Sequence, residues 1–448
     1  MAKPFDDPSK TGIEELDLDS YWMPFTGNRE FKSRPRIIVA ADGWYYRSAD
    51  GRQILDGLSG LWCCGAGHNR QPIAQAIALQ AEVLDYAPAF QFGHPKAFQL
   101  AQKIRSITPE GLEHVFFTNS GSESTETSLK IARGYWRARG QASKTRLIGR
   151  AKGYHGVNFG GLAVGGIGAN RKLFGATLET DHLSHTLLPE NRFSRGMPQQ
   201  GAELADELEE LVALHDASNI AAVIVEPFAG SAGVIPPPQG YLQRLRALCD
   251  HHDILLIFDE VITGFGRCGE VTGAAYFGVT PDIANFAKQL TNGVMPMGAV
   301  VVSPSIYQTF MDIGGPEYMV EFPHGYTCSG HPLACAAALA ALEIFEAEDL
   351  AGQVKTKAPY FEDCIHGLAN HPYVLDVRNI GFAGALTLAA YPDEPARRPY
   401  EIAMWCWERG LYVRYGGDTL QFAPAFVMDK SDIAQIFNIV GDALKATA

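Results

Sequence analysis

The chain has 448 residues, of which 46% are hydrophobic and 19% are charged, and its formal net charge is −13. This length exceeds what one hydrophobic core usually reaches, so we expect two or three domains, and the composition excludes a disordered chain. The acidic balance without any basic run argues against a nucleic-acid or anionic-membrane partner, because phosphate contacts need clustered Lys and Arg.

The amino-terminal residues are polar and acidic and lack the apolar stretch of a secretory signal. The longest run of small apolar residues, 334–342, is shorter than the ~20 residues that cross a bilayer. The eight cysteines are scattered and form no C-x-x-C pair, so we predict neither a metal site nor a disulfide scaffold. These features predict a cytoplasmic protein that has no membrane-spanning segment.

Residues 1–70 are rich in aromatic and turn-forming residues. The stretch 44–46 (Trp-Tyr-Tyr) is followed by Asp50-Gly51, and Asp-Gly is a strong two-residue turn signal, so the pattern predicts a β-hairpin. We assign residues 1–70 to a small domain that is completed by the carboxyl-terminal part of the chain.

Residues 71–340 alternate short apolar runs with longer helical patterns. Apolar strands separated by helices predict a mostly parallel sheet covered on both faces, and hence an α/β large domain. One intervening helix shows an apolar stripe of Tyr241, Leu242, Leu245, Leu248 and Cys249. The predicted strands of this domain are 114–118, 221–225, 254–258 and 299–302.

Residues 341–448 mix helical and strand patterns and end in an amphipathic helix. We predict that this segment and residues 1–70 together form a smaller α+β domain. The apolar face of the final helix consists of Ile433, Ile436, Phe437, Val440 and Leu444.

The stretch 119–123 (Asn-Ser-Gly-Ser-Glu) follows a predicted strand and opens a helix. Ligands of open α/β sheets bind beyond the carboxyl ends of the strands, and a helix N-terminus offers free N–H groups to a phosphate. Ser120 with Glu123 also fits a capping box, so an ordinary capped helix is the alternative. Neither a dinucleotide-binding fingerprint nor a Walker A motif occurs, which disfavours a nicotinamide dehydrogenase.

Two further residues are candidates for catalysis. Asp259 ends an apolar strand, where only a cationic or hydrogen-bonding partner keeps a carboxylate ionised. Lys288 lies in an apolar setting that would lower its pKa and make it a usable nucleophile. A helix cap or loop ion pair for Asp259 and a solvated surface position for Lys288 are the alternatives. A phosphate cradle, a strand-end aspartate and a desolvated amine are together what pyridoxal 5'-phosphate requires.

Along nearly its whole length the sequence resembles the class III (subgroup II) aminotransferases, which are fold-type I pyridoxal-phosphate enzymes. Within this family it is most similar to the ω-amino acid–pyruvate branch. The resemblance rests on stretches 67–69, 119–123, 154–156, 226–227, 259–269, 288 and 324–332, and the branch on 20–26, 61–65, 288–293 and 326–331.

The resemblance implies a role for each matching residue. Lys288 would form the Schiff base with the cofactor and act as acid and base, and Asp259 would pair with the pyridine nitrogen. Thr327 would reach the phosphate of a neighbouring subunit, so the family predicts a homodimer or homotetramer. The remaining cofactor-binding residues would be Ser120, Gly121 and Ser122 at the phosphate, Tyr154 and Val261 on the two ring faces, and Glu226 behind the ring, supporting Asp259 and the substrate-binding arginine.

Arg414 is a lone cation in an apolar, strand-like segment, where it could bind the carboxylate of pyruvate or simply face water. The resemblance implies the carboxylate role, places Trp62 and Tyr154 at the substrate pocket, and leaves His155 to orient loops. The predicted reaction is transfer of an amino group from an ω-amino acid such as β-alanine, or from an amine, to pyruvate. Two alternatives stay open. The first is another class III reaction, such as that of a different-donor transaminase, an aminomutase or a decarboxylase, and the second is a non-catalytic scaffold.

Overall fold

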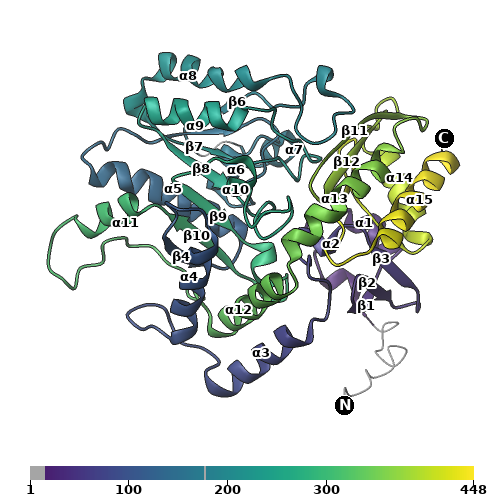
Figure 1. Ribbon diagram of the computed structural model, residues 1–448, viewed down its shortest axis with the longest axis horizontal. Coiled ribbons are helices and arrows are strands. Elements are labelled where there is room, and N and C mark those ends of the chain that lie inside the picture. Colours follow the sequence, from purple (N-terminus) through teal and green to yellow (C-terminus); the bar gives the residue numbers. More distant parts are fainter. Residues whose placement is uncertain (1–15, 176–177, 448) are drawn as a thin grey trace.

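The computed structural model describes residues 16–175 and 178–447. A seven-stranded sheet in the order β4-β10-β9-β8-β7-β5-β6 forms the centre of the larger part of the molecule (Figure 1). The predicted α/β architecture is confirmed, although β10 runs antiparallel to both of its neighbours. The strands are β4 (His114–Thr118), β5 (Arg146–Arg150), β6 (Thr180–Leu183), β7 (Ile220–Val225), β8 (Leu255–Asp259), β9 (Ile283–Phe286) and β10 (Gly298–Val302).

Helices cover both faces of this sheet, because its central strands are apolar on both sides. Neighbouring residues of a strand therefore pack into separate hydrophobic clusters on the two faces of the sheet. Val223, for example, packs on one face and Ile224 on the other. On the first face lie α8 (Glu207–His215) and α9 (Tyr241–His251), with α4 (Pro95–Ile107) and α12 (Pro332–Ala347) beside them. The opposite face is covered by α5 (Gly121–Ala138) and α11 (Pro304–Met311).

Two four-stranded sheets lie to one side of the large sheet (Figure 1). The first has the order β1-β2-β3-β13, and the second has the order β11-β12-β15-β14. Because β13 pairs in parallel with β3, the two ends of the chain share one sheet. The strands are β1 (Ile38–Asp42), β2 (Tyr45–Ser48), β3 (Gln53–Asp56), β11 (Val374–Ile380), β12 (Ala383–Leu388), β13 (Leu411–Tyr412), β14 (Arg414–Gly416) and β15 (Thr419–Phe422).

The predicted amino-terminal hairpin is confirmed as β2–β3, in which Tyr45 pairs with Leu55. Its loop is longer than a two-residue turn, since the Ser48 N–H donates to the Arg52 carbonyl at 3.0 Å. Gly51 lies in this loop with φ +84°, a conformation that favours glycine.

The carboxyl-terminal helices are α13 (Leu350–His366), α14 (Arg397–Glu408) and α15 (Lys430–Ala446). The apolar face predicted for the last helix is buried as expected. The domain limits stay predictions, and α12 runs without a break across residue 340. No helix within the described ranges is both long enough and apolar enough to span a bilayer.

The remaining helices are short connections or lie near the edges of the sheets. They are η3 (Leu18–Ser20), α1 (Asn28–Ser33), α2 (Ser59–Trp62), α3 (Gln71–Val83), α6 (Phe159–Val164), α7 (Gly168–Lys172), η4 (Pro189–Asn191), η5 (Ala202–Asp206), η6 (Ala217–Asn219), α10 (Gly273–Phe277) and η7 (Lys288–Thr291).

Candidate active site

A cavity of about 380 Å³ lies beyond the carboxyl ends of β4, β7 and β8, where a doubly wound sheet is expected to bind its ligand. It brings together most of the site residues that the sequence predicted. Its walls also include Asn119 of the predicted 119–123 stretch, and residues to which the sequence analysis gave no role, such as Cys63 and Met295. The predicted residues that line it are Ser120, Gly121, Ser122, Tyr154, Glu226, Asp259, Val261 and Lys288.

The turn from β4 into α5 forms one wall of the cavity. Ser120 is the N-cap of α5, and its hydroxyl accepts a hydrogen bond from the Glu123 N–H at 3.2 Å. The predicted capping box is only half formed, because the Glu123 carboxylate accepts from the N–H of Asn119 at 2.7 Å instead of from that of Ser120. The first intrahelical bond runs from the Ser124 N–H to the Ser120 carbonyl, so the N–H groups of Gly121 and Ser122 have no intrahelical acceptor.

Gly121 gives this wall its shape. A Cβ atom at this position would lie 2.9 Å from a methyl carbon of Val261, which lines the same cavity. The free N–H groups and the positive end of the helix dipole suit an anion, and the missing side chain lets it come close to the backbone. The donor set and the space therefore fit the phosphate of the expected cofactor.

The loop after β5 packs against this cradle. Gly156 has φ +96°, and a Cβ atom there would lie 2.5 Å from the Ser122 hydroxyl oxygen. The Tyr154 N–H donates to Glu226 Oε1 at 2.9 Å, and Glu226 Oε2 accepts from the Gly230 N–H at 2.9 Å. Burial raises the pKa of the Glu226 carboxyl. The hydrogen-bond partners of Glu226 are thus backbone groups that hold the Tyr154 loop, and not Asp259 or Arg414, as the resemblance implied.

Asp259 ends β8 in a buried position and has the polar partners that an ionised carboxylate needs there. Its Oδ2 lies 2.8 Å from His155 Nδ1, and its Oδ1 accepts from the Val261 N–H at 3.2 Å. His155 is also buried, so the imidazole holds the carboxylate in a fixed orientation at the cavity wall. The sequence analysis missed this contact. The available signal was the place of His155 in the stretch 154–156, one of those that carry the family resemblance.

Lys288 is the first residue of η7, separated from the end of β9 by Ala287, and it lines the cavity wall. Burial lowers the pKa of the Lys288 amine below its ordinary value of 10.5, while the negative charges of Asp259 and Glu226 oppose that effect. The backbone of Lys288 has φ +47°, a rarely populated region for a residue with a side chain. Because β8 and β9 are paired neighbours, Asp259 and Lys288 open into the same cavity.

Three predicted residues do not line this cavity. Trp62 is 1% exposed and packs in the core cluster behind it, while its neighbour Cys63 forms part of the wall. Thr327 is exposed, and its carbonyl accepts a hydrogen bond from the Tyr86 hydroxyl at 3.0 Å. Arg414 is half-buried on the edge strand β14.

Arg414 nevertheless acts on the cavity through its charge. Burial raises the pKa of the Tyr154 phenol, and the positive charge of Arg414 opposes that rise. The same charge adds to the effect of burial in lowering the pKa of Lys288. The buried Nε of Arg414 has no hydrogen-bond partner among the described residues, so a polar group of this cation is left unsatisfied.

The chain is similar to known aminotransferases along nearly its whole length. The chain is 58% identical to the Beta-alanine--pyruvate aminotransferase of Pseudomonas aeruginosa, over 97% of each chain. It is 56% identical to the Omega-amino acid--pyruvate aminotransferase of Pseudomonas putida, over 96% of each chain.

Solved structures of omega-transaminases share the fold. A crystal structure of a thermostable (S)-enantioselective omega-transaminase from Thermomicrobium roseum superposes with a TM-score of 0.89 at 33% identity, covering 96% of this chain and 97% of that one. The omega transaminase from Pseudomonas jessenii in complex with PMP gives a TM-score of 0.90 at 30% identity over 98% of each chain. The profile described as "Aminotransferase class-III" matches residues 26–444. The chain therefore belongs to the class III aminotransferases.

Proposed function

We propose that this aminotransferase moves an amino group from an ω-amino acid such as β-alanine, or from an amine, to pyruvate, with pyridoxal 5'-phosphate as its cofactor. The products are L-alanine and an oxo compound, formed in two half-reactions at one site. The observation that carries the proposal is the shared cavity of Asp259 and Lys288, next to the anion cradle of α5. The names of the two similar Pseudomonas enzymes support the choice of donor and acceptor.

The residues of the cavity fit the cofactor in three places. The Gly121 and Ser122 N–H groups would hold its phosphate, and Tyr154 and Val261 would enclose its ring. Asp259, oriented by His155, would face the ring nitrogen, where a carboxylate at hydrogen-bond distance shifts a pKa by ~1–3 units toward the protonated form. When bound, the cofactor supplies an electron sink that stabilises negative charge at the carbon bearing the amino group.

Lys288 has two tasks in this proposal. Burial lowers the pKa of its amine, so the neutral, nucleophilic form is more accessible than in a solvated lysine. The same Nζ atom, once released, can remove a proton from one carbon and return it to another, because it stays at the cavity wall.

Arg414 would bind the carboxylate of pyruvate. A guanidinium binds a carboxylate through two parallel hydrogen bonds, and such charged bonds contribute a net ~1.5–3 kcal/mol each. The unsatisfied Nε and the influence of the charge on Tyr154 and Lys288 support this role.

We also propose that the active unit contains at least two chains. The segments 79–98 and 318–327 lie side by side. The Tyr86 hydroxyl donates to the Thr327 carbonyl, and a Cβ atom on Gly325 would lie 2.7 Å from the Phe90 ring. Both segments expose large apolar side chains, which single chains rarely do over a wide area. The exposed side chains are Leu79, Val83, Phe90, Phe92, Phe98, Tyr318 and Val320. A second chain on this surface would meet the exposed Thr327, which is the residue expected to reach the partner's cofactor.

The protein is proposed to work in the cytoplasm, in keeping with its eight free cysteines. The reaction is tested by incubating the holoenzyme with β-alanine and pyruvate and measuring L-alanine. We expect one L-alanine for each β-alanine consumed, together with conversion of the cofactor to its amine form when the donor is added alone. An aminomutase or a decarboxylase would instead consume the donor without forming L-alanine from pyruvate.

A further inference from the structure

Arg414 lies on a strand that has little support from its own sheet. β14 is the outermost strand of its sheet and is three residues long, and among the residues that the structure describes it pairs with β15 alone. The chain reaches it directly from β13, which belongs to the other small sheet. An edge strand this short needs contacts from outside the sheet to hold its side chains in one place.

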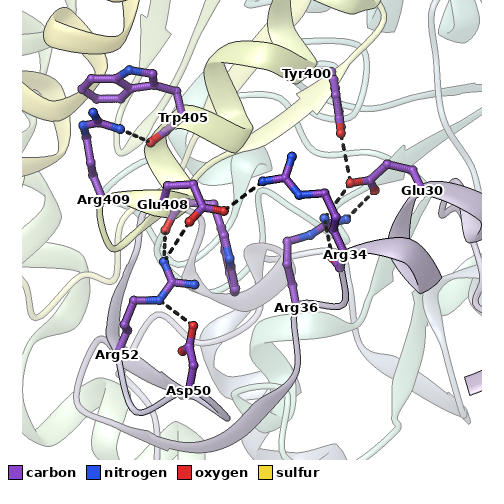
Figure 2. Close-up of polar contacts among 10 residues, drawn as sticks. Glu30, Arg34, Arg36, Asp50, Arg52, Tyr400, Trp405, Glu408 and Arg409 are labelled. Carbon is purple, nitrogen blue, oxygen red and sulfur yellow. Dashed lines mark hydrogen bonds and ion pairs between the residues drawn. The ribbon is translucent and has the colours of Figure 1, made fainter.

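A chain of contacts from the amino-terminal segment supplies that support. The Tyr415 ring packs against the Tyr400 ring of α14, with centroids 5.5 Å apart and planes at 75°. The Tyr400 hydroxyl donates to Glu30 Oε1 at 2.9 Å (Figure 2). Glu30, on α1, is in turn held by Arg36 through two hydrogen bonds of 2.8 Å. Successive side chains of a strand point to opposite faces, so Tyr415 anchors the face of β14 opposite to that of Arg414.

A second network lies beside the first and meets it where Arg36 Nη1 donates to the Arg34 carbonyl at 3.2 Å (Figure 2). Glu408, at the end of α14, lies 3.5 Å from Arg34 and 3.6 Å from Arg52. These ion pairs also tie the amino-terminal segment to α14, and they are more exposed than the Glu30–Arg36 pair. The two networks therefore share elements and one backbone contact, while the ring contact with Tyr415 comes from Tyr400 of the first network.

We propose that Glu30 and Tyr400 are positioning residues that act through Arg414 and so determine the affinity for the carboxylate of the acceptor. The inference rests on the proposed role of Arg414. A bidentate contact with a carboxylate depends on the position and angle of the guanidinium, so a small shift of β14 weakens it. An acceptor without a carboxylate does not use this contact and is unaffected by such a shift.

The test compares pyruvate with propanal, which keeps the reacting carbonyl and lacks the carboxylate, using one amine donor and the holoenzyme. We expect Glu30→Gln and Tyr400→Phe each to raise the KM for pyruvate about three- to tenfold, with the KM for propanal and the kcat changed less than twofold. Glu408→Gln is the matched control, for which we expect no change in the KM for pyruvate. If Glu30→Gln prevents folding, Tyr400→Phe decides, because it keeps the ring contact and removes only the hydroxyl.

A double-variant cycle separates this inference from the proposed function. If Glu30 acts through Arg414, Glu30→Gln adds nothing to the loss of pyruvate affinity that Arg414→Ala causes. Additive losses, equal effects on pyruvate and propanal, or equal effects of the Glu30 and Glu408 variants would overturn the inference and leave the proposed function intact. An Arg414→Ala enzyme with unchanged pyruvate kinetics would remove both the carboxylate role and the inference. A wild-type enzyme that forms no L-alanine would refute the proposed function itself.

Discussion

At the scale of single residues, burial is the main influence on the ionisable groups of the cavity. It lowers the pKa of Lys288, and it raises the pKa values of Glu226 and Cys63. Burial disfavours whichever form of a group is charged, so the amine and the acids shift in opposite directions. The cavity thus holds an amine with a lowered pKa beside carboxylates whose orientation is fixed by hydrogen bonds.

We expect Lys288→Ala to lower turnover by ~10³-fold or more while leaving the fold intact, since the variant loses both the nucleophile and the proton carrier. The measurement is L-alanine formation, with circular dichroism to compare the folded states. Lys144→Met serves as control, because burial also lowers the pKa of Lys144 but its amine bonds the carbonyl of Asp253, outside the cavity. Near wild-type activity of Lys288→Ala would contradict the assignment.

The lowered pKa of Lys288 also predicts a pH dependence of stability in the apoenzyme. Between the lowered value and 10.5 the unfolded chain binds more protons at this lysine than the folded chain does. The contribution of Lys288 to the free energy of unfolding therefore rises with pH in that window, by at most about 1.4 kcal/mol per pH unit, and it is lost as the pH falls.

Urea unfolding of the apoenzyme and of apo Lys288→Met between pH 7 and pH 10 tests this dependence. We expect the difference in unfolding free energy, wild type minus variant, to grow with pH. A difference that stays constant over this range would show that the lysine titrates alike in the folded and the unfolded chain.

At the scale of elements, the site is built from turns that leave strand ends. The β4–α5 turn supplies the proposed anion cradle, β8 ends in Asp259, and Lys288 stands two residues after the last residue of β9. The pairing of β8 with β9 fixes the spacing of the last two residues, while the Tyr154 loop is held by Glu226. The chemistry thus depends on the register of the sheet as much as on the side chains.

We expect Gly121→Ala to weaken cofactor binding about tenfold or more, because the added Cβ must displace the Val261 side chain by several tenths of an ångström. The measurement is the Kd of pyridoxal 5'-phosphate for the apoenzyme, followed by absorbance. Gly168→Ala is the matched control, since a Cβ there meets nothing within 4 Å and Gly168 lies outside the cavity. Equal affinities of the two variants would argue against the cradle.

At the scale of the whole molecule, the two ends of the chain meet in one small sheet beside the large one (Figure 1). Arg267 joins these parts, since its guanidinium donates to the carbonyls of Phe382 and Pro424 and to the Ser59 hydroxyl. The surface formed by the segments around Phe92 and Tyr318 remains exposed in the single chain, where their side chains are 69% and 89% exposed.

We expect Phe92→Glu to shift the protein from a dimer or tetramer to a monomer, because a charge within an apolar interface costs several kcal/mol to desolvate. Activity should fall in parallel, since the proposed site uses Thr327 of a second chain. Sedimentation velocity and the L-alanine assay measure the two effects. Leu214→Glu is the control, because Leu214 is 73% exposed on α8, outside the proposed surface. A wild-type protein that sediments as an active monomer would contradict the proposal.

The local pattern of the sequence determined much of this protein. The apolar runs predicted four of the seven strands of the large sheet and missed β5, β6 and β9. The Asp50-Gly51 turn predicted the β2–β3 hairpin, and the last helix was located from its stripe. Residues at strand ends, Asp259 among them, could be found because the carboxyl ends of parallel strands meet at one edge. The order of the family's stretches along the chain identified the class III aminotransferases, and the comparisons confirm it.

Contacts between distant segments were decided only by the tertiary structure. The bond between His155 and Asp259 joins residues 104 positions apart, and no local pattern encodes such a pair. Three other features also depend on contacts between distant segments. They are the burial of Trp62, the antiparallel pairing of β10 and the hydrogen bond between Tyr400 and Glu30. Local patterns report which face of an element is apolar, whereas the partner of a polar side chain depends on which elements pack together. The physical reason is that packing brings together groups that are far apart in the chain.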